Sequence, residues 1–67
     1  MNYITKRAIS TAKYLIRKGI DPKDAIEITV DKYIQNPKLN IHKLIKEIKK
    51  SLKEDMIEFE EFDYDNL

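Results

Sequence analysis

The side chains in this sequence that could do chemistry are cations and tyrosines near the N-terminus. At 100° per residue, a helix over residues 1–18 places Tyr3 and Tyr14 between two edges of positive charge. These cations are Lys6, Lys13 and Arg17 on one edge, and Arg7 and Lys18 on the other. Cations neutralise phosphates, and a tyrosine ring stacks on a base. The pattern predicts nucleic-acid binding, with Lys6, Lys13 and Arg17 on phosphates and Tyr14 as the stacking residue. The alternative is a solvated face whose tyrosines cover a small core.

A second basic set lies farther along the chain. On a helix, its five lysines fall within about 120° of arc, and they are Lys43, Lys46, Lys49, Lys50 and Lys53. We predict phosphate contacts for Lys43, Lys46 and Lys50. Lysine lacks the planar fork that reads guanine, so this face would bind without sequence specificity and with a strong dependence on salt. The alternative is a solubilising face, partly neutralised by the pairs Lys43/Glu47 and Lys50/Glu54.

The last 14 residues mix acids with apolar side chains, a composition that suits a groove with a basic rim on another protein. The anchors that we predict for such a partner are Met56, Phe59, Phe62 and Tyr64. One alternative is that this segment folds back on the lysines and competes with nucleic acid. Another is a disordered solubilising terminus or a last helical turn packed on the body.

Signals for catalysis are almost absent. His42 is the only histidine, no second ligand stands at a helical spacing from it, and Gly19 is the only glycine, so no glycine-rich phosphate loop is present. There is no cysteine and thus no thiolate metal site. We therefore expect a protein that is not an enzyme and that needs neither a cofactor nor a metal.

Three amphipathic helices should position these residues. The first, over residues 1–18, ends at Gly19; the second runs from the cap Asp21 to about residue 35; the third is capped by Asn40 and ends near residue 53. Their apolar stripes are Ile4, Ala8, Ile9, Ala12, Leu15 and Ile16; Ala25, Ile26, Thr29, Val30, Tyr33 and Ile34; and Ile41, Leu44, Ile45, Ile48 and Leu52. Alternation over residues 26–31 offers a strand as the competing interpretation of the second helix.

The third helix should end where the charge of the chain changes sign. Continued past Glu54, it would put Asp55 in the centre of the apolar stripe and Ile57 on the polar side. All 13 Lys and Arg residues lie at or before Lys53 with only five of the 12 acids, so residues 1–53 carry +8 and residues 54–67 carry −7. The sequence predicts two functional units, a basic body over 1–53 and an acidic tail over 54–67.

Residues 19–26, with Val30, Tyr33 and Ile34, resemble the turn and second helix of ribbon-helix-helix repressors, the DNA-binding half of many antitoxins. In that family a strand before the first helix pairs across a dimer and reads the major groove. Here the first apolar stripe already begins at Ile4, which leaves no strand unless residues 2–7 are extended and the first helix is shorter. The chain is therefore not assigned to the family, and no functional residue is carried over from it.

These observations predict an all-α fold, a small three-helix bundle with an acidic C-terminal tail. The predicted function is that of a small regulatory protein, whose basic body contacts nucleic acid and whose tail contacts a protein. The alternative is a protein-protein inhibitor or adaptor, antitoxin-like or phage-type, that acts through the tail. We expect a cytoplasmic location and no membrane partner, because no apolar run approaches 20 residues. If the protein is a homodimer, Ile28, on the outer side of the second helix, is the first residue we would place in the contact.

Overall fold

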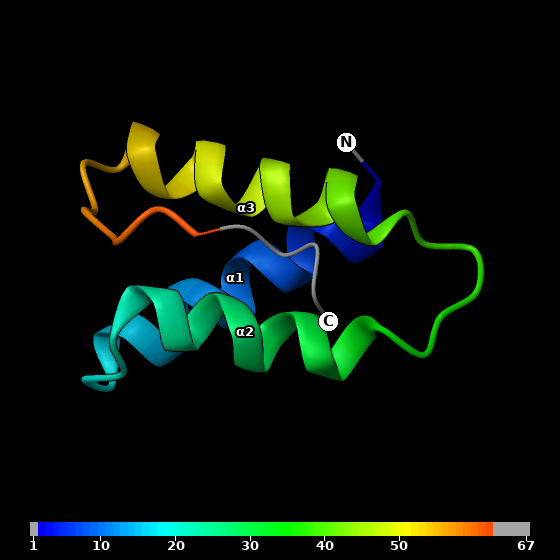
Figure 1. Cartoon of the computed structure of the whole chain (residues 1–67), viewed down its shortest axis with the longest axis horizontal. Coiled ribbons are helices and arrows are strands. Elements are labelled where there is room, and N and C mark those ends of the chain that lie inside the picture. Colours follow the sequence, from blue (N-terminus) through cyan, green and yellow to red (C-terminus); the bar gives the residue numbers. More distant parts are fainter. Residues whose placement is uncertain (1, 63–67) are drawn as a thin grey trace.

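Three helices make up the part of the chain that the computed structural model describes, residues 2–62. Helix α1 spans Tyr3–Arg17, α2 spans Pro22–Tyr33 and α3 spans Ile41–Glu54. Helices α2 and α3 run in opposite directions, and α1 crosses behind them in the view of Figure 1 and packs on both. No strand occurs between residues 2 and 62. The predicted all-α three-helix bundle is confirmed.

Each helix begins at a side chain that accepts a hydrogen bond from the first turn. The Asp21 carboxylate accepts from the backbone N–H of Lys23 at 3.1 Å, and the Asn40 side chain accepts from that of Lys43 at 3.1 Å. Both caps agree with the sequence prediction. A third cap, in which Asn2 accepts from the backbone N–H of Thr5 at 2.8 Å, fixes the start of α1. With α1 beginning at Tyr3, the strand of a ribbon-helix-helix protein has no place among the described residues.

The core lies where the apolar stripes of the three helices meet. Its fully or nearly fully buried apolar side chains are Ala8, Ile9, Ala12, Ala25, Ile26, Val30, Leu44, Ile45, Ile48 and Leu52. All of them belong to the predicted stripes. Because α2 is a continuous helix through residues 26–31, the strand interpretation of that segment is wrong. Ile34 is a further correction: α2 ends at Tyr33, and Ile34 is 43% exposed rather than part of the core.

Helices α1 and α3 end in turns of the same type. In α1, the N–H of Gly19 donates to the carbonyl of Ile16 at 3.0 Å, and the N–H of Ile20 donates to that of Leu15 at 3.1 Å. This pair of hydrogen bonds defines the Schellman motif, whose key residue adopts a left-handed backbone. Gly19 does so with φ 100°.

In α3 the same motif has methionine at the key position. The N–H of Met56 donates to the carbonyl of Lys53 at 3.0 Å, and the N–H of Ile57 donates to that of Leu52 at 2.9 Å. Met56 has φ 60°, and it is the one non-glycine residue between 2 and 62 with a positive φ. The turn moves Ile57 from the polar side, where a continued helix would put it, onto the core. The predicted loss of helical register near Glu54 is thereby confirmed and explained.

Residues 57–62 run back along the bundle, as the orange segment of Figure 1 shows, between α3 and α2. Ile57, Phe59 and Phe62 all pack against the core cluster. No helix within residues 2–62 has the length and apolar character that a membrane crossing requires.

Candidate nucleic-acid interface

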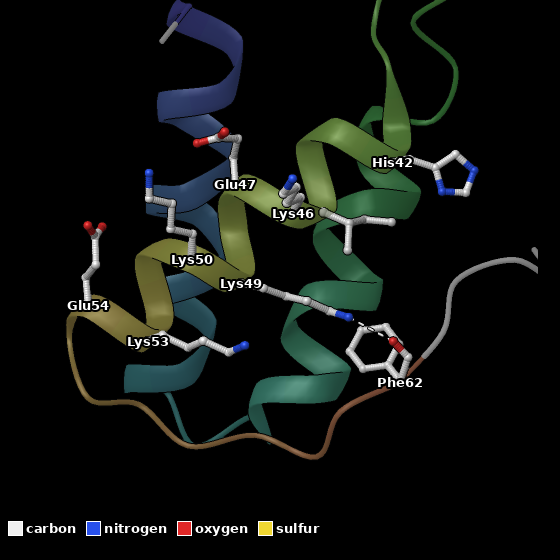
Figure 2. A pocket seen from close by; sticks show the side chains of 9 residues that line it. His42, Lys46, Glu47, Lys49, Lys50, Lys53, Glu54 and Phe62 are labelled. Carbon is white, nitrogen blue, oxygen red and sulfur yellow. Dashed lines mark hydrogen bonds between the residues drawn. The ribbon is translucent and has the colours of Figure 1, made fainter.

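The outward side of α3 carries a row of exposed lysines. We call Lys43, Lys46 and Lys50 the α3 lysine face, since their positions on the helix fall within about 60° of arc and span roughly 10 Å of its axis. Figure 2 shows Lys46 and Lys50 at a shallow groove along this side of α3. The other side chains lining the groove are His42, Ile45, Glu47, Lys49, Lys53, Glu54 and Phe62.

The lysines of this face have no carboxylate partner among the described residues. Glu47 follows Lys43 by four positions and Glu54 follows Lys50 by four, the spacing at which helical ion pairs form. In neither pair do the ammonium nitrogen and a carboxylate oxygen come within 4.0 Å. The ion pairs between residues 2 and 62 involve other lysines, namely Lys13, Lys49 and Lys53. Within the part of the chain that the structure describes, the α3 lysine face therefore lacks the partial neutralisation that these two pairs would supply.

The remaining two lysines of α3 hold the acidic tail. The Lys49 ammonium donates to Oε1 of Glu61 at 2.9 Å and to the backbone carbonyl of Phe62 at 2.8 Å. Lys53 Nζ lies 3.5 Å from the other carboxylate oxygen of Glu61. The side chain of Lys49 is only 17% exposed. Of the alternatives for the tail, the structure shows the fold-back on the lysines for residues 57–62.

Aromatic rings complete this contact. The ammonium of Lys49 lies 4.3 Å from the ring centroid of Phe62, and Lys23 of α2 approaches the same ring at 5.7 Å. Lys53 lies 5.7 Å from the ring centroid of Phe59. A cation over a ring face is attracted by the ring quadrupole, most strongly when water is excluded. In Figure 2 the side chain of Lys49 reaches across to Phe62, so the ring joins α3 to the returning chain.

The environment of Glu61 favours its ionised form. The hydrogen bond from Lys49, with the charges of Lys49 and Lys53, lowers the pKa of Glu61 below its ordinary value of 4.5. The carboxylate is nevertheless open to solvent, and an exposed ion pair of this kind stabilises a fold only modestly. The tail is therefore fastened to α3 near neutral pH and less so in acid.

The residues of α1 that are predicted to contact phosphates do not all share one environment. Lys6 and Arg17 are exposed and make no ion pair with another described residue. Lys13 instead binds Asp55, with 2.7 Å between Nζ and Oδ2, and so connects α1 to the end of α3. Sequence reasoning missed this role of Asp55, because the pair is 42 positions apart in the chain and no periodic pattern links them.

Tyr14, the predicted stacking residue, is 51% exposed, and Tyr3 on the same helix is 71% exposed. Rings this accessible do not serve mainly to cover the core, so of the alternative interpretation of the first helix only the solvated face remains. Tyr14 and Lys6 both line a groove between α1 and α2, on a different part of the molecule from the α3 lysine face.

The residues predicted to bind a protein partner separate into three groups. Phe59 and Phe62 pack against the core of their own chain. Met56, by contrast, is 89% exposed at the tip of the turn after α3. Tyr64 lies outside the described residues. Their role in binding a partner stays a prediction.

Residues 2–62 contain no group of three or more His, Cys, Asp or Glu side chains that could hold a metal ion. Comparison with models of protein families, with curated proteins and with solved structures finds no match to this chain. The guide to its function is therefore the chemistry of its surfaces.

Proposed function

We propose that this protein is a small, non-enzymatic regulatory protein that binds nucleic acid through its basic surface. The observation that carries the proposal is the α3 lysine face: three exposed lysines without a carboxylate partner in residues 2–62, although Glu47 and Glu54 stand at the right spacing to pair with them. Ammonium groups crowded on one side of a helix repel one another unless an anion meets them. Lys6 and Arg17 of α1 add further phosphate contacts.

A nucleic-acid backbone fits the dimensions of the face. Duplex DNA carries about one negative charge per 1.7 Å of its axis. That figure counts both strands, and each strand contributes about one charge per 3.4 Å, so the roughly 10 Å between Lys43 and Lys50 corresponds to about three phosphates of one strand. Lysines act here as point charges, so binding supplies affinity and position without reading bases. A regulator of this kind acts by occupying nucleic acid rather than by selecting one sequence.

Reversal of charge on the face tests the proposal. The double variant Lys46→Glu and Lys50→Glu should bind a labelled duplex about ten-fold more weakly or worse at low salt, because two phosphate contacts become repulsive. The matched control is Lys18→Glu with Lys32→Glu, which changes the net charge equally on the side of α1 and α2. Equal losses in the two double variants, or no duplex binding by the wild type, would contradict the proposal.

A second candidate function, capture of a protein partner through the tail, is favoured by Met56. A large apolar side chain that is 89% exposed, held at φ 60° and followed closely by acids, suits an apolar pocket with a basic rim. Met56→Asn tests this function, because asparagine accepts the left-handed backbone and removes only the apolar anchor. A partner recovered from the source cell with the wild type should be lost with this variant. Recovery unchanged by Met56→Asn would count against the candidate.

A further inference from the structure

A groove between α1 and α2 combines exposed aromatic rings with positive charge. Its lining side chains are Tyr3, Lys6, Arg7, Ser10, Thr11, Tyr14, Leu15, Ile28 and Lys32. We call it the tyrosine groove. Ile28 is half exposed in it, and Leu15 is partly buried. Among residues 2–62, no carboxylate lines the groove, whereas three of the lining residues are cations.

The two tyrosines stand in line along α1. They are 11 residues apart, which corresponds to about 20° of rotation and roughly 16 Å of helix axis. Both rings therefore face the same side of the helix, with Lys6, Arg7 and Ser10 between them. Stacked nucleotides repeat every 3.4 Å or so along a strand, so the distance between the rings accommodates at most about five nucleotides.

Each ring also has its own cation one helical turn farther on. The guanidinium of Arg7 lies 5.7 Å from the ring centroid of Tyr3, and the ammonium of Lys18 lies 5.4 Å from that of Tyr14. The same unit, a tyrosine followed four residues later by a cation, thus occurs twice on one face. A ring with a positive charge at its face offers a base a stacking surface and the attached phosphate a counter-charge.

The charges of the groove select among its occupants. A second copy of the chain, docked groove to groove, would bring Lys6, Arg7 and Lys32 against the same cations and be repelled. An acidic peptide would satisfy the charges, but its acidic side chains offer no flat group that stacks on the two tyrosine rings. Single-stranded nucleic acid supplies both, an anion and a flat aromatic base at each step.

We propose that the tyrosine groove binds single-stranded nucleic acid, with phosphates on Lys6, Arg7 and Lys32 and bases stacked on Tyr3 and Tyr14. The inference rests on the proposed function and names the class of nucleic acid that this second surface takes. A duplex keeps its bases stacked inside and cannot present them to the rings, so the groove distinguishes single strands from the duplexes that the α3 lysine face binds.

The test is a titration of labelled oligothymidylate and oligouridylate, each about six nucleotides long, followed by fluorescence anisotropy. Tyr14→Ala should weaken binding about ten-fold, the usual loss for one stacked base, and Tyr14→Phe should keep the affinity within about two-fold because the ring remains. The control is Ile34→Ala, which shortens another exposed apolar side chain outside the groove and should change nothing. Ring protons of Tyr3 and Tyr14 should shift upfield as the bases stack on them.

Different failures have different meanings. If the duplex binds the α3 lysine face but Tyr14→Ala binds the oligonucleotides as tightly as the wild type does, the inference falls and the proposed function stands. If neither duplex nor single strand binds, both fall. If an acidic peptide binds in a manner that depends on Tyr14 while the oligonucleotides do not bind, the groove serves a protein and the inference is overturned. Equal dependence on Tyr14 for the two oligonucleotides would identify the shared chemistry, whereas a preference for oligouridylate would point to RNA through its 2′-hydroxyl.

Discussion

At the scale of single residues, Met56 has a left-handed backbone conformation that is unfavourable for a residue with a side chain. A left-handed backbone costs an L-residue about 1–2 kcal/mol, and glycine is the usual residue at this place in a Schellman motif. The same turn after α1 has Gly19. The exposed methionine after α3 gains no burial to offset the backbone cost, since it is 89% exposed.

Met56→Gly should therefore stabilise the protein. The gain in the free energy of unfolding should be about 0.5–1 kcal/mol, because relief of the left-handed backbone is partly offset by the greater freedom of glycine in the unfolded chain. Gly19→Ala is the matched opposite. Apart from its two chain neighbours, no atom of residues 2–62 lies within 4 Å of a Cβ built at Gly19, so this variant should lose about 1 kcal/mol through backbone conformation alone. Urea denaturation measures both values, and a destabilised Met56→Gly would refute the interpretation of this turn.

Thr29 gives a second prediction at this scale. It is fully buried, and its hydroxyl has no hydrogen-bond partner among the described residues. A buried polar group left unsatisfied costs about 1–3 kcal/mol. Thr29→Val replaces the hydroxyl with a methyl group of similar shape and should raise the free energy of unfolding by about 1 kcal/mol.

The control for Thr29 is the same substitution at Thr11. The Thr11 hydroxyl donates to the carbonyl of Arg7 at 2.9 Å and lies nearer to solvent, so Thr11→Val should be neutral or slightly destabilising. Thermal unfolding of the two variants is the comparison. A stability loss at Thr29→Val equal to that at Thr11→Val would show that the buried hydroxyl is satisfied.

At the scale of elements, Glu61 is the carboxylate that pairs the returning chain after α3 with Lys49 and Lys53. Because the pKa of Glu61 is lowered in the folded protein, its contribution to tail attachment is present above the ordinary value of 4.5 and is lost as the pH falls through the lowered value. The ring signals of Phe62 and the Lys49 side chain should therefore move together in an NMR titration into acid. Near neutral pH these signals should be constant.

Glu61→Gln should reproduce the acid behaviour at neutral pH, since it removes the charge that faces Lys49 and Lys53. Glu60→Gln is the control, because Glu60 makes no ion pair with another described residue. By loosening the tail, Glu61→Gln should also release Lys49 and Lys53 and strengthen duplex binding by a few-fold at low salt. Phe62 signals that are the same in Glu61→Gln and the wild type would show that the aromatic contacts alone hold the tail.

The elements are also where sequence reasoning was strongest. Helical period, the caps at Asp21 and Asn40 and the stop at Gly19 predict all three helices, because each signal is local and acts within a few residues. The pairing of Lys13 with Asp55 and the covering of Lys49 by Phe62 depend on the path of the chain after α3. That path is set by the turn at Met56, where the glycine that would predict such a turn is absent from the sequence. The exposure of Tyr14 likewise follows from how α1 packs on α2, which the sequence of α1 alone does not contain.

At the scale of the whole molecule, the fold brings part of the acidic C-terminal segment against the basic residues that precede it and leaves other cations exposed. Glu61 and Asp55 of the acidic segment neutralise Lys49, Lys53 and Lys13, so part of the basic excess of residues 1–53 is used within the fold. Among the cations without a described carboxylate partner, three form the α3 lysine face, and Lys6, Arg7 and Lys32 line the tyrosine groove. We assign the duplex backbone to the first surface and single strands to the second.

The salt dependence of duplex binding tests the central claim most directly. Each phosphate neutralised contributes about −0.9 to the slope of log K against log of the salt concentration. Three lysines of the α3 lysine face therefore predict a slope of about −2.7 or steeper for the wild type. In the double variant Lys46→Ala and Lys50→Ala the slope should become shallower by about 1.8. A wild-type slope near zero, or a double variant with the wild-type slope, would contradict the claim that this face binds nucleic-acid phosphates.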